Sequence, residues 1–426
     1  MRSCTVWKGD SPIGPSTRHG GDFRNSIRLL GTRRFGTFWF ASLLSSIGTW
    51  AQQVAQPWLL LNLGASSILL GLDNFAMGAP VFALTLLGGL LADRADRRHV
   101  IALFQSIQML CPLTVVGLLL AGAARPWMIV SLSLVVGITD ALSMPSFQTI
   151  VPSIVEPREI PAGTALNSTQ FNLSRILGPA LAGMLMVSVG AMGAFAVSAA
   201  SYVPFILVAL WILPRANRSA ARPHLSAREQ IFVGIRSIAA DPSLRGALLT
   251  VLMTSLLCAP LITFSPVLIR SAFGGNVGHF SLIIGSFGLG GLLGAAGLLA
   301  VAPDRDRRPI SSRLAAAYGL VTVLVALTHW LWTLPVLFVL AGISMTASNT
   351  SANAILLSAA PARIRGQTVS LYSLAMRGGI AAGSLLTGVS VSLLGVREAL
   401  VINGAAALLL QILIGRRWLG AGTAHQ

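Results

Sequence analysis

Two acidic and two basic side chains lie well inside apolar stretches of this 426-residue sequence, where charges are rare. The acids are Asp73 and Asp140, and the bases are Arg175 and Arg377. A carboxyl group in such a place can take up and release a proton, whereas a guanidinium stays charged and needs a counterion, an anionic ligand or water. The residue types therefore suit proton coupling and the pairing or binding of anions.

The two acids differ in position. Asp140 falls near the middle of its apolar stretch and Asp73 nearer to an end, so Asp140 is the first candidate for proton coupling and Asp73 the second. The alternative is a fixed ion pair between Asp140 and Arg175 or Arg377, and a paired acid could also be the coupling site.

Amide side chains recur at helical spacing in two other stretches. Gln52, Gln53 and Gln56 follow Thr49 at the spacing of one helix face, and Asn349 and Asn353 repeat that spacing. Rows of this kind either line a polar cavity or bond neighbouring helices together. We favour the cavity for the amide rows. The full set of candidate substrate-cavity residues is Gln52, Gln53, Gln56, Arg175, Asn349, Asn353 and Arg377.

The elements that position these groups are predicted to be membrane-spanning helices. The sequence is 54% hydrophobic and only 10% charged, against about 25% charged residues in soluble domains. A bilayer-spanning helix needs about 20 apolar residues. We expect twelve of them, roughly at 36–62, 67–92, 99–121, 126–152, 164–189, 191–213, 247–270, 279–301, 312–330, 335–359, 368–392 and 396–415.

Charged loops predict the orientation and the domain boundaries. Arg residues concentrate in alternate loops, which places those loops and both chain ends in the cytoplasm. The linker contains Ser226 and Glu229, a capping box that opens an amphipathic helix. The predicted parts are a disordered tail at 1–30, a six-helix bundle at 31–213, a cytoplasmic linker at 214–246, a second six-helix bundle at 247–416 and a tail at 417–426.

The two halves repeat each other. Gly137–Gln148 aligns with Gly342–Asn353 at an offset of 205 residues, and the Asp-Arg-Arg run at 96–98 recurs at 306–308. Arg175 has its counterpart in Arg377. A parallel repeat of six and six helices places a binding site between the halves.

A loop signature carries a family resemblance. Residues 89–98 read Gly-Leu-Leu-Ala-Asp-Arg-Ala-Asp-Arg-Arg, which resembles the loop between helices 2 and 3 of the major facilitator superfamily, with Asp96 in place of its second Gly. The resemblance implies an all-α integral membrane fold of twelve transmembrane helices, in two six-helix bundles related by a pseudo-twofold axis. It also implies a cytoplasmic gate, formed here by Gly89, Asp93, Arg94, Arg97 and Arg98.

A narrower resemblance rests on three short motifs. Ala165-Leu-Asn-Ser168, Asp241-Pro-Ser-Leu-Arg245 and Arg365-Gly-Gln resemble the enterobactin-exporter-like, or transmembrane secretion effector, branch. That branch includes siderophore and macrolide exporters, although the motifs belong to the scaffold and say little about substrate.

Together these features predict a proton-coupled exporter of amphipathic small molecules such as siderophores or drugs, working by alternating access. We expect a monomer in the inner membrane of a bacterium, with protons, a small-molecule substrate and lipids as partners. The alternatives are an uptake permease of the same fold and a transport-inactive membrane sensor or assembly protein.

Other function classes fit poorly. The net charge of +17 does not indicate nucleic-acid binding, because the Arg residues sit in short loops beside apolar segments. Lys8, followed by Gly9 and Asp10, is not part of a phosphate-binding loop. Neither the cysteines nor the histidines suggest a metal site or an enzyme. We expect no cofactor and no metal.

Overall fold

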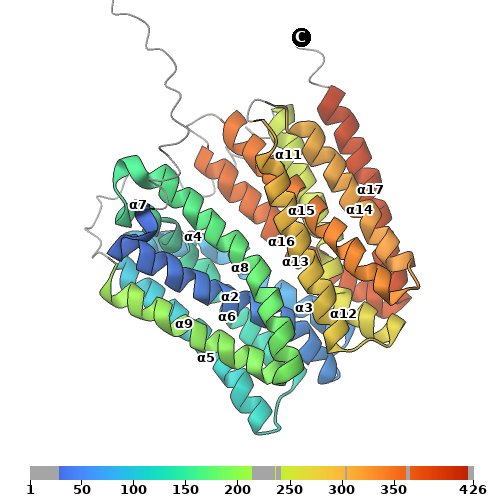
Figure 1. Ribbon diagram of the computed structural model, residues 1–426, viewed down its shortest axis with the longest axis horizontal. Coiled ribbons are helices and arrows are strands. Elements are labelled where there is room, and N and C mark those ends of the chain that lie inside the picture. The colour runs from blue at the N-terminus through green and yellow to red at the C-terminus, as the bar shows by residue number, and fades with distance from the viewer. Residues whose placement is uncertain (1–27, 214–235, 237–240, 303–304, 361–364, 421–426) are drawn as a thin grey trace, which may run out of the picture.

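The computed structural model describes residues 28–213, 236, 241–302, 305–360 and 365–420. Every regular element in these residues is helical (Figure 1). The predicted amphipathic helix of the linker lies outside the described residues, as does nearly all of the N-terminal tail.

Eleven stretches of the described residues are long and apolar enough to cross a membrane, so the chain is an all-helical, multi-pass membrane protein. A further long helix, α2, packs against α8 and α9, and its row of polar side chains lowers its hydropathy. The first half contains α2 (Arg33–Asn62), α3 (Ser67–Gly78), α4 (Pro80–Arg94), α5 (Arg97–Leu120), α6 (Pro126–Gln148), α7 (Ile150–Ile154), α8 (Ile160–Ser188) and α9 (Gly190–Trp211). The second half contains α11 (Pro242–Met253), α12 (Pro260–Phe273), α13 (Val277–Leu299), α14 (Arg308–Leu327), α15 (Leu334–Ala359), α16 (Arg365–Leu394) and α17 (Val396–Gly420).

Prolines interrupt two spans that the sequence analysis took as continuous. Pro80 separates α3 from α4, and Pro260 begins α12 directly after a π-helical turn over Thr254–Cys258. Proline lacks the backbone N–H that would continue the helix ladder, so the chain bends or adds a residue at these points.

The helix ends fall into two groups. The basic end carries Arg33, Asp96–Arg98 and Asp306–Arg308, and the distal end carries the turns at Gly64 and Gly274. These glycines follow α2 and α12 with φ of 79° and 59°, a conformation that Gly adopts without a Cβ penalty. They occupy equivalent places in the two halves.

The Asp-Arg-Arg repeat also takes one geometry twice. Asp96 and Asp306 each accept the backbone N–H two residues later, at 3.1 and 2.9 Å, and each pairs with the side chain of that same Arg. Burial acts to raise the pKa of both carboxyls, but the bonds and the charge of Arg98 and Arg308 outweigh it and hold each pKa below its usual value. The repeat therefore places the same Asp–Arg contact at the start of both helices, although α5 begins at Arg97 and α14 begins at Arg308, one repeat position later.

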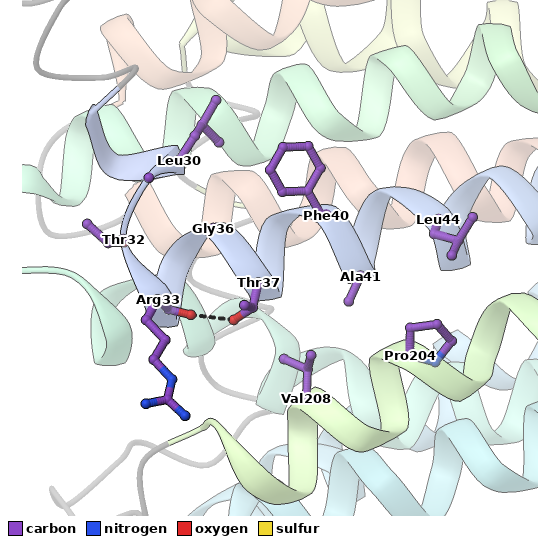
Figure 2. A pocket seen from close by; sticks show the side chains of 11 residues that line it. Leu30, Thr32, Arg33, Gly36, Thr37, Phe40, Ala41, Leu44, Pro204 and Val208 are labelled. Atoms are coloured by element: carbon purple, nitrogen blue, oxygen red, sulfur yellow. Dashed lines mark hydrogen bonds between the residues drawn. The ribbon is translucent and has the colours of Figure 1, made fainter.

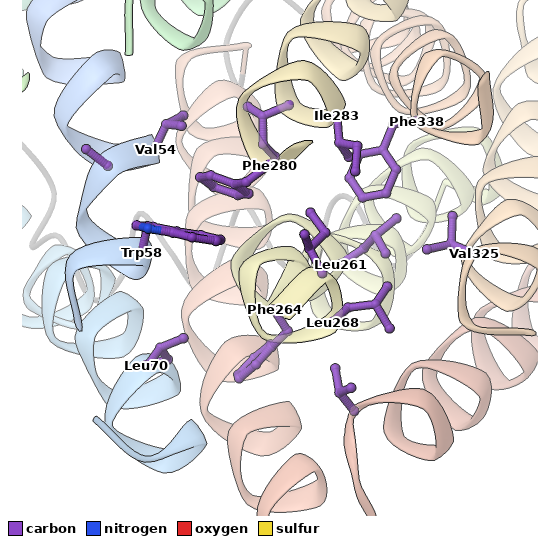
Figure 3. Packing of buried hydrophobic residues seen from close by; sticks show 14 of the residues in the cluster. Val54, Trp58, Leu70, Leu261, Phe264, Leu268, Phe280, Ile283, Val325 and Phe338 are labelled. Atoms are coloured by element: carbon purple, nitrogen blue, oxygen red, sulfur yellow. The ribbon is translucent and has the colours of Figure 1, made fainter. Parts of the chain in front are cut away.

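The buried apolar residues show where the halves meet. At the distal end one core includes Trp58 of α2 and Leu70 of α3 together with Phe264 of α12 and Phe280 of α13 (Figure 3). At the basic end there are two separate cores, one with members only from residues 29–213 and one only from 244–418. Figure 1 agrees, because α3 and α12 lie together while α7 and α11 lie apart. The halves are thus joined at the distal end.

Small residues allow close packing between α3 and α16, which belong to different halves. A Cβ added at Gly71 would overlap the backbone oxygen of Ser384, and one at Gly388 would lie 2.7 Å from the backbone oxygen of Ser67. Glycine at these positions lets two backbones approach within contact, as is common in membrane helix pairs.

We expect Gly71→Leu to lower the unfolding temperature of the detergent-solubilised protein by several degrees, because overpacking of this kind costs about 1–3 kcal/mol. The matched control is Gly117→Leu, since a Cβ there meets nothing within 4 Å. Differential scanning fluorimetry of both variants makes the comparison. Equal unfolding temperatures would show that α3 and α16 are not held this closely.

Candidate functional site between the two halves

One ion pair joins the halves at mid-span. Nη1 of Arg377 in α16 donates to Oδ2 of Asp140 in α6, and the two side chains are 33% and 37% exposed. The other ion pairs in the described residues join neighbours within one loop or turn. Of the two pairing partners that the sequence left open for Asp140, the structure selects Arg377. The pair is partly open to solvent even though it lies between membrane-spanning helices.

Asp73 occupies a different place. It is 2% exposed within the first half and accepts two hydrogen bonds, from Nε2 of Gln56 at 2.7 Å and from Oγ of Ser133 at 2.6 Å. Gln56 also donates to Ser133 at 2.7 Å. Gln56 of α2, Asp73 of α3 and Ser133 of α6 therefore form one hydrogen-bonded group, the Gln56 cluster. Both partners are neutral, so this carboxyl has hydrogen bonds but no cation within its cluster.

The amide row of α2 faces other helices of its own half. Oε1 of Gln52 accepts a hydrogen bond of 2.8 Å from Ser198 in α9, and Gln53 lies 3.8 Å from the sulfur of Met77 in α3. Gln52, Gln53 and Gln56 line a small cavity of about 20 Å³ together with Tyr202. A cavity of this size has room for roughly one water molecule. The row therefore forms one wall of a small pocket inside the first half.

The remaining candidates lie on α8 and α15. The guanidinium of Arg175 in α8 stands 5.5 Å from the ring centre of Trp50 in α2. In α15, Asn349 is 8% exposed and its Oδ1 is buried without a hydrogen-bond partner, whereas Asn353 is half-buried. Among the described residues, no hydrogen bond, ion pair or ring contact links these three to Gln56, Asp73 or Ser133.

The signature loop is described in part. Gly89, Asp93 and Arg94 belong to the last turns of α4, and their side chains lie outside the described part of the structure. Arg97 begins α5, and its Nε is buried without a hydrogen-bond partner there. Arg98 pairs with Asp96 in the same loop at 3.1 Å.

A larger hollow of about 510 Å³ lies elsewhere, on the flank of the first half. Its walls are the start of α2, with Arg33 and Phe40, and the segment of α9 that holds Pro204 and Val208 (Figure 2). Because both walls come from one half, this hollow does not lie between the halves and is not part of the candidate site.

The sequence analysis named the site residues but missed several residues that contact them. Ser133 precedes Asp140 by seven positions and so shares its helix face, a spacing that could have indicated it. Trp50, Trp58 and Phe280 gave no signal, because an aromatic residue in a span is most often ordinary packing.

Comparison with known proteins places this architecture. A model of the family described as "Transmembrane secretion effector", within the major facilitator superfamily, matches residues 27–423. The chain belongs to this family. It is therefore a major facilitator secondary transporter and not an enzyme, as the loop signature and the repeat predict.

Two relatives of this transporter have names that state a function. The staphyloferrin A transporter of Staphylococcus aureus is 25% identical over 174 residues, which cover 41% of this chain and 44% of that protein. The multidrug efflux pump Tap of Mycolicibacterium fortuitum is 25% identical over 392 residues, which cover 87% of this chain and 94% of Tap. The match thus spans less than half of the first relative and nearly all of the second.

Solved structures share the fold of this transporter. A variant of the nucleoside transporter NupG superposes with a TM-score of 0.74 at 13% identity, covering 90% of this chain and 100% of that one. A bacterial homologue of the lysosomal transporter Spinster, inward-facing and occupied, gives 0.68 at 16% identity, with 94% and 97% covered. At such low identity these likenesses establish the major facilitator fold alone.

Proposed function

We propose that this transporter is a proton-coupled exporter of amphipathic small molecules, such as siderophores or drugs, in the inner membrane of a bacterium. The observation that carries the proposal is the ion pair between Asp140 and Arg377, since one member of this link between the halves can gain or lose a proton. The siderophore and drug substrates named for the two relatives support the substrate class.

The separate cores indicate the state of the molecule. If the basic end faces the cytoplasm, as the Arg distribution predicts, then the joined distal end makes this an inward-facing arrangement. In it Asp140 is paired with Arg377. Substrate would enter from the cytoplasm or the inner leaflet, and the site between the halves would bind it.

Export would then follow from a change in the charge of Asp140. In the outward-facing state the carboxyl takes up an external proton, which neutralises it and removes its attraction for Arg377. Return to the inward-facing state releases that proton to the cytoplasm, and the pair forms again. Asp73, which is hydrogen-bonded to Gln56 and Ser133, is the second proton site in this scheme. Gly89, Asp93, Arg94, Arg97 and Arg98 would close the basic end when the distal end opens.

Transport into proteoliposomes tests the proposal. We expect inside-out vesicles with an acidic lumen to accumulate a siderophore, a macrolide or a lipophilic cation, and to lose it when an uncoupler dissipates the gradient. Protein-free vesicles under the same gradient are the control. Accumulation only in right-side-out vesicles would favour an uptake permease, and binding without transport in either orientation would favour a sensor.

A further inference from the structure

Equivalent arginines of the two halves have different surroundings. Arg377 is paired with Asp140, but Arg175 forms no ion pair and donates no hydrogen bond among the described residues. Its neighbours are aromatic. The guanidinium stands over Trp50, and the phenol groups of Tyr372 and Tyr318 are within electrostatic range of it.

Such a cation is costly in a membrane span, where Arg is normally paired or hydrated. A cation–π contact contributes about 0.5–2 kcal/mol, and it uses only the flat face of the guanidinium. The five N–H donors at the edge of the group meet no hydrogen-bond acceptor in the described part of the chain, so they can bind one from a ligand. Among the described residues, neither half supplies an anion that pairs with the half-buried Arg175.

The surroundings of Arg175 come from both halves. Trp50 belongs to α2, which packs against α8 so closely that a Cβ at Gly178 would overlap the Cβ of Trp50. The edge of the Trp50 ring meets Phe171 at 6.1 Å between centroids, which fixes the indole on α8. Tyr372 belongs to α16, the same helix as Arg377. Arg175 therefore faces the region between the halves, beside a rigid aromatic surface.

We propose that Arg175 binds an anionic group, a carboxylate in the first place, of the transported compound. Guanidinium and carboxylate match as a two-pronged, charge-assisted pair. Trp50 and Tyr372 would contact the apolar or aromatic part of the same molecule. The preferred substrate is then an amphipathic carboxylate, which deepens the proposed function and rests on it for the claim that the compound is carried.

A binding measurement tests this inference without any gradient. The probes are pyrenebutyrate and its neutral amide, titrated against the purified full-length protein in phosphatidylcholine nanodiscs. We expect the wild-type protein to bind the acid at least ~10-fold more tightly than the amide, in line with hydrogen bonds to charged groups. Arg175→Gln should remove this preference by weakening the acid alone, and Arg175→Lys should keep part of it.

The matched control is Arg125→Gln, which removes the same charge from an exposed loop and should leave both affinities unchanged. Equal affinity of the wild-type protein for acid and amide would overturn the proposal, and that result requires no variant to fold. Equal loss of affinity for both probes in Arg175→Gln would overturn it too.

Phosphatidylglycerol that displaces pyrenebutyrate at Arg175 would assign the anion to a lipid headgroup and overturn the substrate assignment. Selective binding without gradient-driven transport would contradict the proposed function only.

Discussion

Asp140→Asn is expected to abolish gradient-driven transport while the protein still folds and inserts. Asparagine preserves the size and the acceptor oxygen of the side chain, so a hydrogen bond from Arg377 can persist. It cannot gain or lose a proton, and the link between the halves then no longer changes with proton binding. We therefore expect the initial rate of gradient-driven uptake in proteoliposomes to fall to the level of protein-free vesicles, because coupling needs a side chain that changes its charge.

Three variants separate coupling from structure in this experiment. Asp140→Glu keeps a titratable group and should retain part of the transport. Asp73→Asn removes the other acid within the spans. If that variant loses transport while Asp140→Asn keeps it, the coupling site is Asp73 and not Asp140. The charge swap Asp140→Arg with Arg377→Asp should restore thermal stability relative to either single change, without restoring transport. Full transport by the swapped protein would show that the pair is only a structural link.

The sequence predicted the charged residues of the candidate site, but not which Arg pairs with Asp140. The high cost of a charge in hydrocarbon requires that an acid such as Asp140 have a partner, and that follows from sequence. Arg175 and Arg377 satisfied the requirement equally, because the repeat places them at equivalent positions. Which Arg reaches Asp140 depends on the angles at which α6, α8 and α16 cross. Neither sequence segment around these Arg residues predicts those angles.

A similar limit applies to the amide row. The spacing of Gln52, Gln53 and Gln56 correctly predicts one helix face, since period depends only on the helix itself. What that face contacts depends on the neighbouring helices. Here the contacts are Ser198, Met77 and Asp73, all in the same half.

The fold was more accessible than the site. Apolar length, Arg-rich loops and the internal repeat predicted an all-helical membrane protein with two bundles, and the comparisons confirm the major facilitator fold. The breaks at Pro80 and Pro260 were present in the sequence as prolines but were passed over. The distal core left no signal, because apolar side chains that join two halves are the same residue types as those that face lipid.

Trp58→Ala is expected to shift the transporter toward the outward-facing state. Trp58 of α2 stacks on Phe280 of α13 with 5.3 Å between ring centroids, and both lie in the one core that the halves share (Figure 3). Stacked aromatic pairs contribute about 0.5–1.5 kcal/mol beyond their buried area. Because the contact exists only while the distal end is closed, its loss should raise the outward-facing population by roughly 10-fold.

The labelling rate of a cysteine beneath the closed end measures this shift. Val54→Cys, in a protein whose Cys4, Cys111 and Cys258 are replaced, places a thiol in the shared core at a position that is 8% exposed. A membrane-impermeant maleimide added from the distal side should label it ~10-fold faster when Trp58→Ala is present, consistent with the population change. Trp127→Ala is the control, since that indole is 60% exposed near the same end.

If the thiol introduced by Val54→Cys is labelled at the parental rate in both Trp variants, the stacked pair does not hold the distal end closed. Closure must then come from the α3–α16 contact at Gly71. If Trp58→Ala alone labels faster, the distal core is the barrier that every transport cycle has to open.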